Sequence, residues 1–188
     1  MPPAEAPFLG QDCRSPYSWR EHVARAAWVM VQSTLFRFSP SRLHGWRAWL
    51  LRCFGSDIPQ PSQVVIFPSA RVHFPWQLRL EPHSMVGREV TLYNLGRITL
   101  RRGANISQRS HLCAGTHDYR RWSMPVVRRE IVIGENVWVA AQVFVGPGVT
   151  IGELAVVAAG SVVLDDLPER TVCAGNPCRV LKPRPEPS

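Results

Sequence analysis

His117 is the residue of this chain best placed for acid–base chemistry. It lies in the segment CAGTHDY, residues 113–119, where a regular sequence repeat stops and an irregular excursion begins. Imidazole titrates near neutral pH, so it can take a proton from a hydroxyl and give it back within one cycle. A His at the root of a loop that leaves a rigid scaffold suits that role. The alternative is that His117 is an ordinary solvated loop residue, because the chain contains six His and most need no catalytic role.

The repeat that leads to His117 has a period of six residues. Its clearest stretch begins each hexapeptide with Val or Ile, at Ile133, Val139, Val145, Ile151, Val157 and Val163. A small or β-branched residue follows four positions later, at Val137, Val143, Val149, Ala155 and Ser161. This period matches neither an α-helix nor an ordinary strand and is typical of a parallel β-helix. The leading residues are expected to point into the coil axis and to stack from coil to coil.

The same register continues toward the N-terminus. Earlier hexapeptides begin at Ile66, Val72, Leu80, Val86, Leu92, Leu100, Ile106 and Leu112, with two-residue slips near Leu78 and Ile98. We therefore predict an all-β core of about five triangular coils from about Val64 to Leu167. The one large interruption, Asp118–Val132, is predicted to project as a loop.

The N-terminal third predicts two helices, Tyr17–Phe38 with Ser18 as cap and Ser41–Phe54 with Gly55 as stop. The predicted organisation is a helical extension over 1–62, a β-helix domain over 63–180 and a tail over 181–188. The helices are rich in Trp and Arg, and two interpretations stay open. They cap the open end of the β-helix, or they make a peripheral contact with a membrane surface.

Composition narrows the class of protein. The formal net charge of +8 comes with no block of basic residues and no aromatic–basic ladder, so we expect no nucleic-acid partner and favour a phosphorylated ligand. Five scattered Cys show no metal-ligand spacing and indicate reduced thiols in the cytoplasm. No signal peptide and no transmembrane stretch is expected.

Several segments together resemble the hexapeptide-repeat O-acetyltransferases. The hexapeptide array, the loop after a single His and the closing AGNPCRV, residues 174–180, carry this resemblance. More narrowly, TLYNLGRITL, ISQRSHLCAGTHDY, VWVAAQVFVGPGVTIGE and SPSRLHGWRAWLLRCFG resemble the colanic-acid-biosynthesis acetyltransferases of bacterial exopolysaccharide clusters. The resemblance implies a left-handed β-helix, a homotrimer and transfer of acetyl from acetyl-CoA to a hydroxyl of a saccharide or lipid-linked glycan, without a metal.

The resemblance also implies roles for single residues. His117 matches the general base of the family, and Cys113 need not be a nucleophile because no acyl-enzyme is required. The residues matching coenzyme-A contacts are Trp138, Ala141, Ala159, Arg179 and Lys182. Asn94 matches a ligand of the acceptor hydroxyl, although an Asn that only shapes a coil corner fits equally well. Arg101, where relatives carry Gly, and Leu164, where they often carry Thr, depart from the pattern.

Two other functions are alternatives to the acetyltransferase. A metal-dependent β-helix enzyme of the γ-carbonic-anhydrase kind needs three His ligands, and His111 and His117 are one hexapeptide apart, so they are not expected to stack. A non-catalytic scaffold is the second alternative. Zinc analysis together with a thiol-release assay separates the three.

Overall fold

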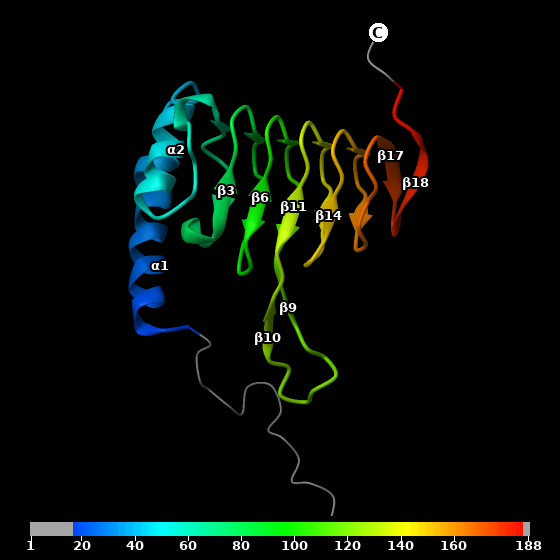
Figure 1. Cartoon of the computed structure of the whole chain (residues 1–188). Coiled ribbons are helices and arrows are strands. Elements are labelled where there is room, and N and C mark those ends of the chain that lie inside the picture. The colour runs from blue at the N-terminus through cyan, green and yellow to red at the C-terminus, as the bar shows by residue number, and fades with distance from the viewer. Residues whose placement is uncertain (1–16, 186–188) are drawn as a thin grey trace, which may run out of the picture.

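The computed structural model describes residues 17–185, so Cys13 and the start of the predicted extension lie outside the described residues. The chain forms a parallel β-helix with two helices stacked on its N-terminal end (Figure 1). The helices are α1 (Trp19–Val31), continued by a π-helical turn (Gln32–Phe36), and α2 (His44–Cys53). Two short 3-10 turns follow at Pro61–Gln63 and Pro75–Gln77.

Three sheets form the sides of the coils. The first sheet holds β1 (Val65–Ile66), β4 (Met85–Val86), β7 (Asn105–Ile106), β12 (Trp138–Val139), β15 (Val156–Val157), β17 (Thr171–Gly175) and β18 (Cys178–Pro183). The second holds β2 (Arg71–Val72), β5 (Thr91–Tyr93), β8 (His111–Cys113), β13 (Phe144–Val145) and β16 (Val162–Val163). The third holds β3 (Leu78–Leu80), β6 (Ile98–Leu100), β11 (Ile131–Ile133) and β14 (Thr150–Ile151).

The leading aliphatic residues of the hexapeptides form the core. One ladder pairs Ile66, Val86, Ile106, Val139 and Val157 in successive coils, and all five are buried. A coil alone could not bury these side chains, so the stack itself provides the hydrophobic stabilisation. The predicted β-helix is therefore confirmed.

The two-residue slips have a common structural cause. In the third sheet, β3, β6 and β11 carry an extra buried residue at their start, and these residues, Leu78, Ile98 and Ile131, pair in successive coils. Each slip therefore falls at the same corner, between the second and the third sheet. The large excursion also leaves the coil at this corner, between β8 and β11.

The predicted bounds of the excursion, Asp118–Val132, are wrong at both ends. The chain leaves the coil already at β9 (Gly115–His117), which pairs antiparallel with β10 (Val126–Arg128). Ile131 and Val132 belong to β11, and Ile131 is buried in the core. The excursion is therefore a β-hairpin, which projects from the middle of the solenoid (Figure 1). Pairing of the extended residues around Val126 draws three residues of the predicted coil into the hairpin.

The helices close the open end of the first coil, as one of the two interpretations predicted. Trp28 is buried, and its Nε1 donates to the carbonyl of Val72 at 2.6 Å. Gln32 accepts from the Val72 amide at 2.8 Å, and the buried Arg47 donates through Nε to the carbonyl of Ile66 at 2.6 Å. Side chains of the helical layer thus satisfy backbone groups that an open sheet edge would leave unpaired.

The opposite end is closed by β18, which pairs antiparallel with β17. This strand runs to Pro183 and so includes the first three residues of the predicted tail, which was expected to begin at residue 181. Lys182 therefore lies on a strand.

Candidate active site

The tautomer of His117 is set by the hairpin. Its Nδ1 lies 2.6 Å from the carbonyl oxygen of Met124, and a carbonyl can only accept, so Nδ1 carries the proton. The Nε2 atom of the neutral ring then keeps its lone pair. An imidazole oriented in this way can accept a proton at Nε2 while Nδ1–H stays bonded.

The turn of the hairpin presents the Met124 carbonyl to the ring. Met124 has a left-handed backbone, with φ of 41°, and its amide donates to the carbonyl of Arg121. Asp118 closes the turn, because its amide donates to the carbonyl of Pro125 and its carboxylate accepts from the amide of Arg120. No sequence signal identified Met124, since its contribution is a main-chain atom.

The hairpin stands on the segment before β6. The Ala114 carbonyl accepts from the amides of both Gly96 and Arg129 at 3.0 Å, so both feet of the hairpin meet there. A Cβ added at Gly96 would lie 2.6 Å from the carbonyl oxygen of Arg129 and 2.8 Å from that of Ala114. Only glycine allows this approach. The only signal of this contact in the sequence is a Gly just before the slip at Ile98, and a Gly at a coil corner does not by itself indicate a functional site.

Helix α1 braces the far side of the hairpin. The guanidinium of Arg128 on β10 lies 3.7 Å from the carboxylate of Glu21 and 5.7 Å from the ring centre of Tyr17. The N-terminal layer therefore contacts both the first coil and the strand paired with His117.

The predicted coenzyme residues lie on a different part of the surface from His117 and its hairpin. Trp138 is half exposed on the first sheet, and its Nε1 donates to Ser107 Oγ at 3.0 Å. The ladder from Trp138 runs through Val156 and Val172 to Lys182, so Trp138 and Lys182 share one outward row about 14 Å long. Arg179 is exposed at the same end and is bonded to the Asp165 carboxylate at 3.2 Å.

Ala141 and Ala159 lie on one corner in neighbouring coils. Ala141 connects β12 to β13, Ala159 connects β15 to β16, and the Ala141 carbonyl accepts from the Gly160 amide at 2.9 Å. This corner joins the first sheet to the second. The hairpin of His117 leaves the corner between the second and the third. A single chain therefore places His117 and these two predicted coenzyme positions on different edges of the triangular solenoid.

Asn94 makes structural hydrogen bonds, and its role in acceptor binding stays a prediction. Its side chain is buried, its Oδ1 accepts from the amides of His73 and Phe74, and its Nδ2 donates to the Phe74 carbonyl at 2.6 Å. These bonds fix the slip before Leu78 and join the amide to the backbone of the preceding coil.

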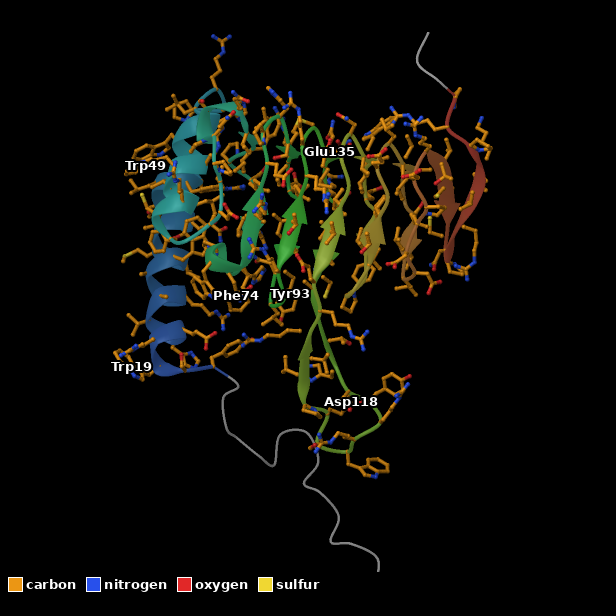
Figure 2. The ribbon with its side chains drawn as sticks, in the orientation of Figure 1. Trp19, Trp49, Phe74, Tyr93, Asp118 and Glu135 are labelled. Carbon is orange, nitrogen blue, oxygen red and sulfur yellow. The ribbon has the colours of Figure 1, made fainter. Side chains whose placement is uncertain are left out.

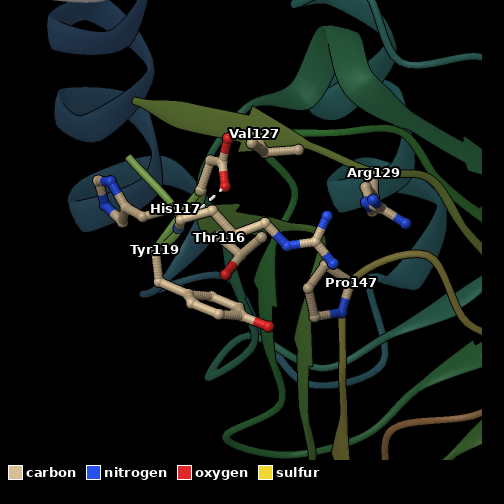
Figure 3. Close-up of a pocket in the computed structure, with 8 residues that line it drawn as sticks. Thr116, His117, Tyr119, Val127, Arg129 and Pro147 are labelled. Carbon is tan, nitrogen blue, oxygen red and sulfur yellow. Dashed lines mark hydrogen bonds between the residues drawn. The ribbon is translucent and has the colours of Figure 1, made fainter. Parts of the chain in front are cut away.

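A hollow of about 410 Å³ lies beside the hairpin. From the hairpin it is lined by Thr116, His117, Asp118, Tyr119, Arg120 and Val127, and from the coil side by Arg129 and Pro147. In Figure 3 the His117 imidazole lies on the side away from Arg129 and Pro147. His117 therefore borders the hollow of one chain, but its ring is exposed and is not enclosed by it.

The outer face of the second sheet carries further titratable groups near the hairpin. His73 packs edge-on against Tyr93, with ring centres 5.0 Å apart. Burial, followed by the charges of Arg25, His111 and Arg71, lowers the pKa of His73, and burial lowers that of His111. Both shifts favour the neutral form of the imidazole. Among residues 17–185, no group of three or more His, Cys, Asp or Glu side chains is arranged to hold a metal ion.

Comparison with known proteins defines the class. The family model for the bacterial transferase hexapeptide (six repeats) matches residues 130–165. A structure from Vibrio cholerae, the hexapeptide-repeat acetyltransferase VCA0836 in complex with acetyl coenzyme A, superposes with a TM-score of 0.79 at 26% identity over 95% of this chain and 97% of that one. A maltose O-acetyltransferase from Clostridium difficile 630 gives a TM-score of 0.77 at 25% identity over 90% of each chain.

A relative of higher identity narrows the assignment. WcaF of Escherichia coli K12, named as a colanic acid biosynthesis acetyltransferase, is 47% identical over 159 residues, which cover 85% of this chain and 86% of WcaF. The chain belongs to the hexapeptide-repeat acetyltransferases, in the same family as WcaF.

Proposed function

We propose that this protein transfers an acetyl group from acetyl-CoA to a hydroxyl of a saccharide or lipid-linked glycan precursor in the cytoplasm. The observation that carries the proposal is the hydrogen bond between His117 Nδ1 and the Met124 carbonyl, which leaves Nε2 as the acceptor. The names of the relatives support the substrate class, since they include a maltose O-acetyltransferase and a colanic acid biosynthesis enzyme.

The proposed reaction is a direct transfer. Nε2 of His117 takes the hydroxyl proton as the acceptor oxygen attacks the thioester carbonyl carbon. The carbon–sulfur bond then breaks, and the proton passes from Nε2 to the departing thiolate. The bond to Met124 holds the ring in one tautomer throughout and stabilises the imidazolium that forms. Cys113 needs no covalent role, because its Sγ lies against its own segment, 3.2 Å from the carbonyl oxygen of Gly115.

The coenzyme is proposed to lie along the corner of Ala141 and Ala159. Small side chains there let the pantetheine arm approach the backbone, and Trp138 flanks it. Lys182 and Arg179 supply positive charge for the phosphates. Because one chain places this corner and His117 on different edges, the proposed active unit is a homotrimer with each site between two chains. Light scattering is expected to give the mass of three chains, and a fully active monomer would contradict this.

The proposal is tested by thiol release from acetyl-CoA, with acceptors found by screening mono- and oligosaccharides. His117→Ala is expected to lower kcat by roughly 10²–10⁴-fold and to leave the affinity for coenzyme A nearly unchanged. Cys113→Ala is the matched control, because it removes the other candidate reactive side chain of the same segment, and it should retain most activity. An inactive Cys113→Ala beside an active His117→Ala would replace direct transfer by an acyl-enzyme route.

A further inference from the structure

The helical layer carries apolar side chains on its outer surface as well as on its inner one. On α1, Trp19, Val23 and Met30 lie on the side of the helix opposite the buried Trp28, and all three are well exposed. On α2, Trp46 and Trp49 are exposed and stack on each other with ring centres 5.1 Å apart. Figure 2 shows Trp19 and Trp49 on the side of this layer that faces away from the β-helix.

The exposed side chains of the two helices meet in a shallow groove. It has a volume of about 410 Å³ and is lined by Thr34, Leu35, Phe38, Ser39, Pro40, Leu43 and Trp46. Phe38 is 83% exposed at its rim, and Trp46 Nε1 donates to the Leu35 carbonyl at 3.3 Å, which fixes one wall. We call Trp19, Val23, Met30, Leu35, Phe38, Leu43, Trp46 and Trp49 together the outer apolar face.

Along the part of this face from Val23 to Trp49 the charge has a single sign. Between Glu21 and Asp57 the chain contains five Arg and no Asp or Glu. Arg47 is buried and bonded to the first coil, but Arg37, Arg42 and Arg52 are exposed. An apolar protein partner or a second copy of this chain would not require an excess of Arg over Asp and Glu around the face. Aromatic side chains ringed by Arg alone match the interface of an anionic bilayer, where Trp lies at the headgroup level and Arg binds phosphate.

We propose that the outer apolar face docks this protein on an anionic phospholipid surface, with α1 and α2 lying in the plane of the membrane. Trp46, Trp49 and Phe38 insert among the acyl chains near the headgroups, and Arg37 and Arg42 contact lipid phosphates. The β-helix and the hairpin of His117 then stand on the water side. This goes beyond the acetyl transfer proposed above and does not depend on it.

The test is flotation of the purified full-length protein with vesicles of phosphatidylcholine alone or of equimolar phosphatidylcholine and phosphatidylglycerol. Wild type is expected to float with the anionic vesicles and to be released by high salt. Arg37→Glu/Arg42→Glu should weaken the partition coefficient at least about tenfold. The control Arg101→Glu/Arg102→Glu makes the same change of net charge on the β-helix and should bind like wild type.

A second pair separates insertion from simple charge attraction. Trp46→Ser/Trp49→Ser should abolish flotation, whereas Leu181→Ser, also an exposed apolar side chain but at the C-terminal end, should not. Melting temperatures show that each variant is folded, and the Arg pair decides the matter if the Trp pair does not fold. Equal binding of the two Arg pairs, or no preference for anionic vesicles, would overturn the proposal. A further result would also overturn it: wild type does not bind vesicles but self-associates, and Trp46→Ser/Trp49→Ser abolishes this self-association. A second copy of the chain would then cover the outer apolar face.

Discussion

Gly96→Ala should impair catalysis without touching any group that reacts. Its Cβ would lie 2.6 Å from the carbonyl oxygen of Arg129, whereas ordinary contacts of a Cβ begin near 3.4 Å. The neighbours are main-chain atoms, so they cannot rotate away. One foot of the hairpin must move by roughly 0.8 Å to relieve the contact.

The hairpin should transmit most of this displacement to His117. Three successive residue pairs join β9 to β10, from Gly115 with Arg128 to His117 with Val126, so the hairpin moves as one piece. A misplacement of about 1 Å can cost roughly 100-fold in rate, and we therefore expect kcat to fall about 10- to 100-fold. Thiol release at saturating acetyl-CoA measures it.

Gly87→Ala is the matched control. A Cβ there would lie 2.8 Å from the carbonyl oxygen of Ile106, a conflict of similar size in a coil turn far from the hairpin. Both variants should lose about 1–3 kcal/mol of unfolding free energy, but only Gly96→Ala should lose activity. Equal kcat values in the two variants would refute the proposal that a Cβ at Gly96 displaces His117 through the hairpin.

Three further predictions concern stability and coenzyme binding. Arg47→Met should cost about 2–4 kcal/mol in urea unfolding, since it strips donors from the carbonyls of Ile66, Pro40 and Ser41, while the exposed Arg52→Met should be nearly neutral. His73 has a pKa below its ordinary 6.5 in the folded state, so the unfolded chain binds more protons as the pH falls through 6.5. Wild type should therefore lose stability below this pH, and His73→Phe should lose less, as read from melting temperatures at two pH values. Lys182→Glu should raise KM for acetyl-CoA roughly fivefold and leave kcat unchanged, because the side chain is proposed to meet phosphate and not the thioester.

The coils were predictable because each hexapeptide repeats the same physical requirement. An inward aliphatic residue every six positions leaves a strong pattern, and the buried ladder through Ile106 and Val139 follows it without exception. The ends of the excursion were not predictable in this way. Ile131 keeps the ladder of the third sheet, but it stands two positions before the hexapeptide leader Ile133 and so reads as loop when the period alone is followed.

The site was predictable only where a side chain carries the role. His117 stood out by its type and by its place at the end of the repeat. Met124 and Ala114 contribute main-chain carbonyls, which any residue type could supply, so composition and spacing contain no trace of them. Asn94 shows a different limit. The resemblance suggested an acceptor ligand, and only the structure reveals that its buried amide also bonds to the backbone of His73 and Phe74.

The slips, the hairpin and Asn94 all belong to one corner of the solenoid. Asn94 fixes the first slip through Phe74, and the following Gly96 seats the feet of the hairpin in the next coil. An insertion at this corner leaves the aliphatic ladders intact, because Leu80, Leu100 and Ile133 still pair on the far side of it. The fold can therefore carry His117 on an added hairpin while the core that supports it stays regular. Changes at the corner should consequently alter activity before they alter the coil, which is the distinction that Gly96→Ala and Gly87→Ala measure.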